Sequence, residues 1–128
     1  MRLLLDTNVL IWWFVRPEAL RPKLMAWLAD EDCEVWVSPA SLWEMAIKHK
    51  IGRLPEAGAL LADASAISDQ GFRELPISHA HAIRAGGLPL HHRDPFDRLI
   101  VAQSLVERLP VASSDRSFDA YGVERFWQ

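Results

Sequence analysis

Cysteine is almost absent from this sequence of 128 residues, in which Cys33 is the only one. A lone cysteine excludes an internal disulfide and suits a reducing compartment, so we expect a cytoplasmic protein. Long apolar runs are absent as well: none approaches the ~20 residues that a membrane-spanning helix requires, and we expect no membrane association. The first residues enter an apolar run without a small-residue cleavage site, which indicates that they are not a signal peptide.

Linkers, internal repeats and low-complexity segments are also missing, so we interpret residues 1–128 as one domain. Half of the residues are apolar and 24% are charged, which is ordinary for a globular protein with a buried core. Basic residues are not in excess, because the formal net charge is −3. This sign argues against a nucleic-acid partner unless the acidic residues are concentrated at one site.

Short apolar segments alternate with helical patterns along the chain. Leu3, Leu4 and Leu5 are consecutive, which is typical of a strand in the middle of a parallel sheet. Further strands are predicted at 33–38, 72–75, 110–115 and 124–127, and helices at 9–14, 20–29, 39–50, 55–68, 79–87 and 95–108. Alternating strands and helices imply right-handed crossovers. We therefore predict an α/β protein of three layers, α/β/α, whose central five-stranded sheet is mostly parallel.

Four acidic residues fall at one predicted edge of this sheet. Asp6 and Asp115 end strands, Glu44 lies in the helix that follows the second strand, and Asp97 lies in the first turn of a later helix that Asp94 caps. In open α/β sheets the carboxyl edge is where ligands bind. Each acid also has a purely structural interpretation, as a helix cap, a turn residue or, for Glu44, an ion-pair partner four residues before a lysine.

Clustered carboxylates repel one another unless a cation neutralises them. Their hard oxygen atoms select Mg²⁺ or Mn²⁺, and such ions activate water for the hydrolysis of phosphodiesters. Setting these four negative charges aside from the net charge of −3 leaves +1, so the remaining surface is slightly basic. We assign Arg93 and Arg98 as weak contacts to the phosphates of a substrate.

The same stretches resemble the successive motifs of PIN-domain proteins and, among these, the toxin ribonucleases of VapBC toxin–antitoxin pairs. The matching segments are 5–9, 41–48, 94–103 and 113–115, and their order agrees over essentially the whole chain. The resemblance implies an endoribonuclease that depends on Mg²⁺ or Mn²⁺, forms homodimers and is inhibited by a cognate antitoxin. Carried over by position, it implies that the catalytic metal ligands are Asp6, Glu44, Asp97 and Asp115, supported by Asn8 and Ser113.

Two alternatives stay open. Asp119 is a substitute for Asp115, because the fourth acid varies in position within the family. The competing function is that of a non-catalytic PIN-like module that binds RNA or a protein. A zinc site is not expected, since His91 and His92 lack partner cysteines, and we interpret these two histidines as substrate contacts or simple loop residues.

Overall fold

The computed structural model describes residues 1–92 and 94–128, so the predicted phosphate contact Arg93 lies outside the described residues. The strands are β1 (Arg2–Leu5), β2 (Glu34–Val37), β3 (Arg73–Glu74), β4 (Val111–Ala112) and β5 (Arg125–Phe126). The α-helices are α1 (Thr7–Val15), α2 (Pro22–Ala29), α3 (Pro39–Lys50), α4 (Gly58–Ala62), α5 (Ser65–Asp69), α6 (His79–Gly87) and α7 (Pro95–Glu107). Three short 3-10 helices join them: η1 (Pro17–Ala19), η2 (Pro55–Ala57) and η3 (Arg116–Tyr121).

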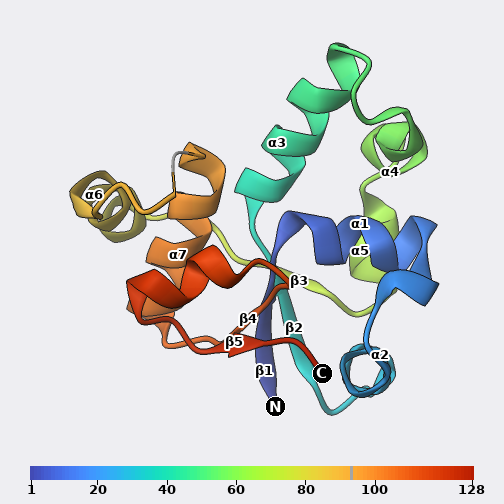
Figure 1. The fold of residues 1–128 in the computed structure, drawn as a ribbon. Coiled ribbons are helices and arrows are strands. Elements are labelled where there is room, and N and C mark those ends of the chain that lie inside the picture. Colours follow the sequence, from blue (N-terminus) through green and yellow to red (C-terminus); the bar gives the residue numbers. More distant parts are fainter. Residues whose placement is uncertain (93) are drawn as a thin grey trace.

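The five strands form one parallel sheet in the order β3-β2-β1-β4-β5, so β1 is central, as predicted. In β1, Leu4 aligns with Trp36 of β2 on one side and with Val111 of β4 on the other. Figure 1 shows α1 and α2 on one side of the sheet and α6 and α7 on the other. The predicted three-layer α/β/α fold is confirmed.

The consecutive leucines of β1 explain its central place. Leu3 and Leu5 pack into the core cluster that contains residues of α1 and α2, whereas Leu4 packs against Ile100 of α7 on the opposite face. Side chains of a strand alternate between faces, so a strand that is covered on both sides has no polar position. Burying each leucine side chain stabilises the folded state by about 1.5–3 kcal/mol. None of the described helices is both long and apolar enough to cross a membrane.

Local capping signals set the beginnings of the major helices. Ser38 accepts a hydrogen bond from the backbone N–H of Ala40 (3.1 Å) ahead of Pro39, and Ser78 caps α6. Thr7 and Asn8, whose residue types favour the capping position, precede the predicted helix start at residue 9. Both residues lie inside the helix, and Asp6 is the cap.

The alanine-rich segment 55–68 was predicted to be one helix, and this prediction is wrong. The segment forms η2, α4 and part of α5, with an interruption at Asp63. The Asp63 carboxylate accepts hydrogen bonds from the backbone N–H (3.2 Å) and the hydroxyl (2.5 Å) of Ser65. Such local bonds compete with the helical hydrogen-bond pattern, and they end the helix there.

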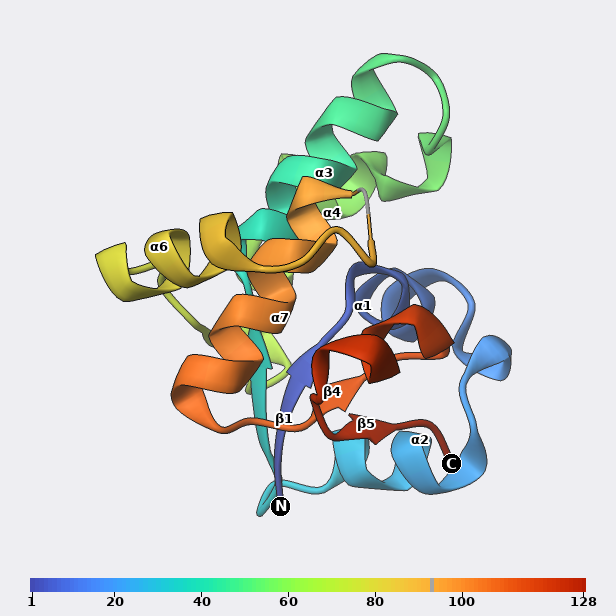
Figure 2. The same ribbon diagram turned by 60° about the vertical axis from the view of Figure 1, so that its left-hand side comes forward.

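The topology brings three segments to the carboxyl edge of the sheet. The chain leaves β1 into α1 and leaves β2 into α3, and the segment after β4 leads into η3. Figure 2 shows the beginning of α7 beside α3, beyond the carboxyl end of β1. The side chains at the starts of these helices and loops therefore face a common region.

Candidate active site

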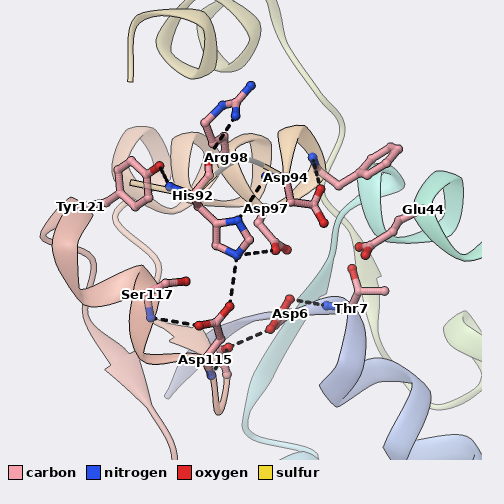
Figure 3. Close-up of polar contacts among 12 residues, drawn as sticks. Asp6, Thr7, Glu44, His92, Asp94, Asp97, Arg98, Asp115, Ser117 and Tyr121 are labelled. Atoms are coloured by element: carbon pink, nitrogen blue, oxygen red, sulfur yellow. Dashed lines mark hydrogen bonds and ion pairs between the residues drawn. The ribbon is translucent and has the colours of Figure 1, made fainter. Parts of the chain in front are cut away.

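Asp6 lies at the centre of the site, at the junction between β1 and α1. Its carboxylate accepts a hydrogen bond from the backbone N–H of Thr7 at Oδ1 (2.8 Å) and from the hydroxyl of Ser113 at Oδ2 (2.7 Å). The side chain is buried, with the residue 6% exposed. The strand end, the helix start and the segment after β4 thus hold this carboxylate in one orientation (Figure 3).

Ser113 connects Asp6 to Asp115. Its fully buried hydroxyl donates to Asp6 and accepts a hydrogen bond from the backbone N–H of Asp115 (3.0 Å). Asp115 caps η3, since its Oδ1 accepts from the N–H of Ser117 (2.9 Å). The predicted supporting position of Ser113 is therefore in direct contact with a candidate acid.

Glu44 projects from α3 toward Asp6 and is 5% exposed. Its Oε2 forms an ion pair with Lys48 (2.5 Å), the predicted partner four residues later. The other oxygen, Oε1, is buried and has no hydrogen-bond partner among the described residues. A buried carboxylate oxygen without a donor is costly, so this atom is available for a ligand.

Asp97 is the third residue of α7 and is half-buried. The spacing of Asp94 and Asp97 is that of a capping box, and the structure shows only one half of it. Asp94 is indeed the cap, because its Oδ1 accepts from the N–H of Phe96 (2.9 Å). The backbone N–H of Asp94, however, donates to Nδ1 of His92 (3.2 Å), and the Asp97 carboxylate points into the site.

His92 is a site residue whose position the sequence did not reveal. Its Nε2 lies 2.9 Å from Oδ2 of Asp97 and 3.1 Å from Oδ2 of Asp115 (Figure 3). We had interpreted it as a loop residue or a substrate contact. The only available signal was its place two residues before the cap of an acid-bearing helix, where a ring can reach the first turn.

The remaining predicted residues differ in their exposure and in what they contact. Asn8 is exposed, and its side chain makes no hydrogen bond to any other described residue. Asp119 is exposed and binds Arg125 through both carboxylate oxygens (2.9 and 3.2 Å). Arg98 donates from Nη1 to the backbone carbonyl of His92 (3.0 Å), so at least part of its guanidinium holds the loop.

The mutual proximity of the acids shows in the pKa of Asp97. Burial, followed by the negative charges of Asp6, Asp94, Glu44 and Asp115, raises this pKa to about 8. Without a cation, Asp97 therefore retains its proton at neutral pH. The charges of Asp6, Glu44 and Asp115 all contribute to this shift, which places these three acids near Asp97.

The pKa values of Asp6 and Asp115 shift in opposite directions. Burial raises the pKa of Asp6 to about 6, even though the hydrogen bonds from Ser113 and Thr7 favour the charged form. For Asp115, partial burial raises the pKa, but hydrogen bonds from Ser117 and His92 outweigh it and leave the pKa below its ordinary value. The cluster thus combines a charged carboxylate at its rim with buried ones that resist ionisation.

A family model of the PIN domain matches residues 3–124. The chain belongs to the PIN domain family. No curated protein matches the sequence.

Solved structures share this PIN fold over nearly their whole length. VapBC2 of Rickettsia felis, bound to a DNA fragment from the promoter, is 14% identical with a TM-score of 0.73 and full coverage of both chains. FitAcB of Neisseria gonorrhoeae is 24% identical, with a TM-score of 0.65 over 97% of this chain and 96% of the other. A toxin–antitoxin complex of Klebsiella pneumoniae is 25% identical, with a TM-score of 0.58 over 90% and 88%.

The donor set of this PIN domain fits a hard divalent cation. One ligand atom each from Glu44, Asp94 and Asp97 lies within 4.8 Å of the other two, and the same holds for His92, Asp97 and Asp115. Glu44, whose buried Oε1 has no hydrogen-bond partner among the described residues, belongs to the first group, so the cluster is more than a gathering of exposed acids. Carboxylate oxygens in this arrangement are ligands that Mg²⁺ and Mn²⁺ prefer.

Proposed function

We propose that this PIN domain is a metal-dependent endoribonuclease that acts as the toxin of a toxin–antitoxin pair. The observation that carries the proposal is the convergence of Asp6, Glu44, Asp97 and Asp115 from four separate segments on one edge of the sheet. Two of these carboxylates have a raised pKa, and a third has a buried oxygen without a partner. The carboxylates of such a cluster repel one another when they are ionised. A bound cation offsets this repulsion and stabilises their charged forms.

We assign Asp6, Asp97 and Asp115 as the principal ligands of Mg²⁺ or Mn²⁺, and Glu44 as a further ligand or as the residue that orients the attacking water. When bound, such an ion lowers the pKa of water and offsets the negative charge that develops on the phosphate. In the reaction a water molecule gives up a proton as its oxygen bonds to phosphorus, the bond from phosphorus to the leaving oxygen breaks, and the leaving oxygen takes up a proton in its place.

The surrounding residues prepare this site before substrate arrives. Ser113 and Thr7 orient the Asp6 carboxylate by hydrogen bonds, so its oxygen atoms do not need to reorganise. Thr7 also donates from its hydroxyl to Ser41 (3.0 Å), which fixes α1 against α3 and with it the distance between Asp6 and Glu44. Arg93 and Arg98 stay proposed phosphate contacts.

The test is RNA cleavage by the purified chain. We expect fragments with Mg²⁺ or Mn²⁺, none with EDTA, and recovery when the metal is restored. Asp6→Asn protein purified in parallel measures any contaminating nuclease. Cleavage that persists undiminished in EDTA refutes the metal mechanism, and intact RNA under every metal condition favours the non-catalytic binding module.

We also propose that the protein forms homodimers and binds a cognate antitoxin in the cytoplasm. One similar solved structure is a toxin–antitoxin complex of Klebsiella pneumoniae, and an acidic site suits a partner that inserts a basic side chain. For the dimer, the support is an apolar stripe on and just beyond α3, where Trp43, Ile47 and Ile51 are 62%, 41% and 60% exposed at intervals of four residues.

These partners predict two results. The chain expressed alone should arrest growth, and the purified protein should elute as a dimer at micromolar concentration in size-exclusion chromatography with light scattering. The Ile47→Glu variant places a charge in the stripe and should elute as a monomer, because burying that charge opposes association. A monomeric wild type together with normal growth would contradict the toxin assignment.

A further inference from the structure

His92 is held by hydrogen bonds to its backbone N–H, its carbonyl and its ring. The backbone N–H of His92 donates to the hydroxyl of Tyr121 (2.7 Å), and that hydroxyl donates to the carbonyl of Pro89 (2.8 Å). The His92 carbonyl accepts from Arg98 (3.0 Å), and the ring nitrogen Nδ1 accepts from the N–H of Asp94 (3.2 Å). A loop residue with so many tethers has a defined ring orientation.

The hydrogen bond at Nδ1 decides what the other nitrogen does. A nitrogen that accepts an N–H bond carries no proton of its own, so the ring proton is on Nε2. This Nε2–H faces Oδ2 of both Asp97 and Asp115, at 2.9 and 3.1 Å. With its lone pair used by the proton, Nε2 is a donor to the two acids and not itself a metal ligand, although it lies close enough to be counted as one.

The two carboxylates come from opposite sides of the site. Asp97 belongs to the first turn of α7, whereas Asp115 caps η3 beyond β4. When both carboxylates are ionised their like charges repel, and His92 is the described residue that donates to both. Each carboxylate has two oxygens with about four acceptor positions, so a donor at Oδ2 leaves room for a cation.

We propose that His92 is a positioning residue of the metal site, whose Nε2–H holds the carboxylates of Asp97 and Asp115 together so that they would bind a divalent cation. The inference rests on the proposed function, since it assumes that these acids bind a metal. Removing a residue that is hydrogen-bonded to a metal ligand typically weakens metal binding by about 10–100-fold. His92 acts through the two acids, and Tyr121 acts through His92.

The experiment measures Mn²⁺ affinity by electron paramagnetic resonance of the free ion, which needs no RNA and no turnover. His92→Phe keeps a ring beside Phe118, whose centroid is 6.1 Å away, and removes the donor. We expect this variant to bind Mn²⁺ 10–100-fold more weakly than wild type. His92→Gln restores an N–H donor on a side chain of similar reach, and we expect its affinity within about threefold of wild type.

His91→Phe is the matched control. His91 is exposed, and its ring contacts Tyr121 edge-on at 5.1 Å, so phenylalanine preserves that contact and the Mn²⁺ affinity should not change. Tyr121→Phe removes both hydrogen bonds of the hydroxyl and gives a second measurement should His92→Phe not fold. We expect its affinity to fall by roughly three- to tenfold, less than for His92→Phe, because Nε2–H is retained.

The outcomes separate the two hypotheses. A wild type that binds Mn²⁺, with His92→Phe binding equally well, overturns the role of His92 and leaves the nuclease assignment intact. The role is also overturned if His92→Gln binds as weakly as His92→Phe, because the donor is then not what matters. A wild type that binds no Mn²⁺ overturns the proposed function itself.

Discussion

The Asp115→Asn variant is expected to cleave RNA at least roughly a thousandfold more slowly than wild type. The substitution removes a negative charge and one ligand oxygen from the cluster, and a metal ion supplies several kcal/mol of transition-state stabilisation. The fold should persist, because the amide oxygen of Asn can still accept the hydrogen bond from Ser117 that Asp115 accepts (2.9 Å). Initial cleavage rates with saturating Mn²⁺, alongside thermal melts, measure the effect.

Asp119→Asn is the matched control, since the sequence left these two acids as alternatives. The Asp119 carboxylate is exposed and engaged by Arg125. An exposed ion pair contributes little to stability, so we expect cleavage within about twofold of wild type. The opposite result, with Asp119→Asn inactive and Asp115→Asn active, would transfer the role of fourth acid to Asp119.

The second large effect concerns the stability of Asp97→Asn. In EDTA at pH 7.5 this variant should melt at the wild-type temperature or above it. Asp ionises near pH 3.9 in an unfolded chain, whereas the folded pKa of Asp97 is about 8. Between these values the folded state binds more protons than the unfolded state, so wild-type stability falls as the pH rises through this window.

The dependence of the free energy of unfolding on pH has an upper limit for a single titrating group. One group contributes at most about 1.4 kcal/mol per pH unit. Asp6, with a pKa of about 6, acts in the same direction mainly below pH 6, so the range from pH 6 to 8 isolates Asp97. Asparagine cannot ionise, and the Asp97→Asn variant should therefore show a flatter dependence of melting temperature on pH there.

With bound metal, wild type should melt at a higher temperature than Asp97→Asn. A ligand at a hundredfold excess over Kd stabilises the folded state by about 2.7 kcal/mol, which is roughly 10 °C for a domain of this size. Wild type should gain this amount with Mg²⁺ or Mn²⁺, and Asp97→Asn much less. Melts with EDTA and with millimolar metal provide the measurement, and Asp119→Asn should respond as wild type does.

A different result would reduce Asp97 to a helix-capping acid. In that case the substitution loses only a favourable interaction with the helix dipole, typically 0.3–1 kcal/mol. The apo variant would then be slightly less stable than wild type, and metal would affect both proteins equally. The assignment of Asp97 as a ligand would fail with this outcome.

The sequence predicted the elements whose causes are local. Three consecutive leucines indicated a doubly covered central strand, and the dipeptides Ser38-Pro39 and Asp94-Pro95 located the starts of α3 and α7. It failed in the segment 55–68, where the high alanine content indicated one continuous helix. There a side-chain hydrogen bond of Asp63 to Ser65 interrupts the helix, and propensity summed over a window does not detect such a bond.

From the sequence by itself we predicted that Asp6, Glu44, Asp97 and Asp115 fall at one edge of the sheet, because the carboxyl ends of parallel strands lie at the same edge. Only the tertiary structure decided which groups contact these acids. Ser113 bonds to Asp6 across 107 positions of the chain, and the loop after α6 brings His92 between two carboxylates. Such contacts depend on the path of loops and the direction of individual side chains, which no periodic pattern in the sequence specifies.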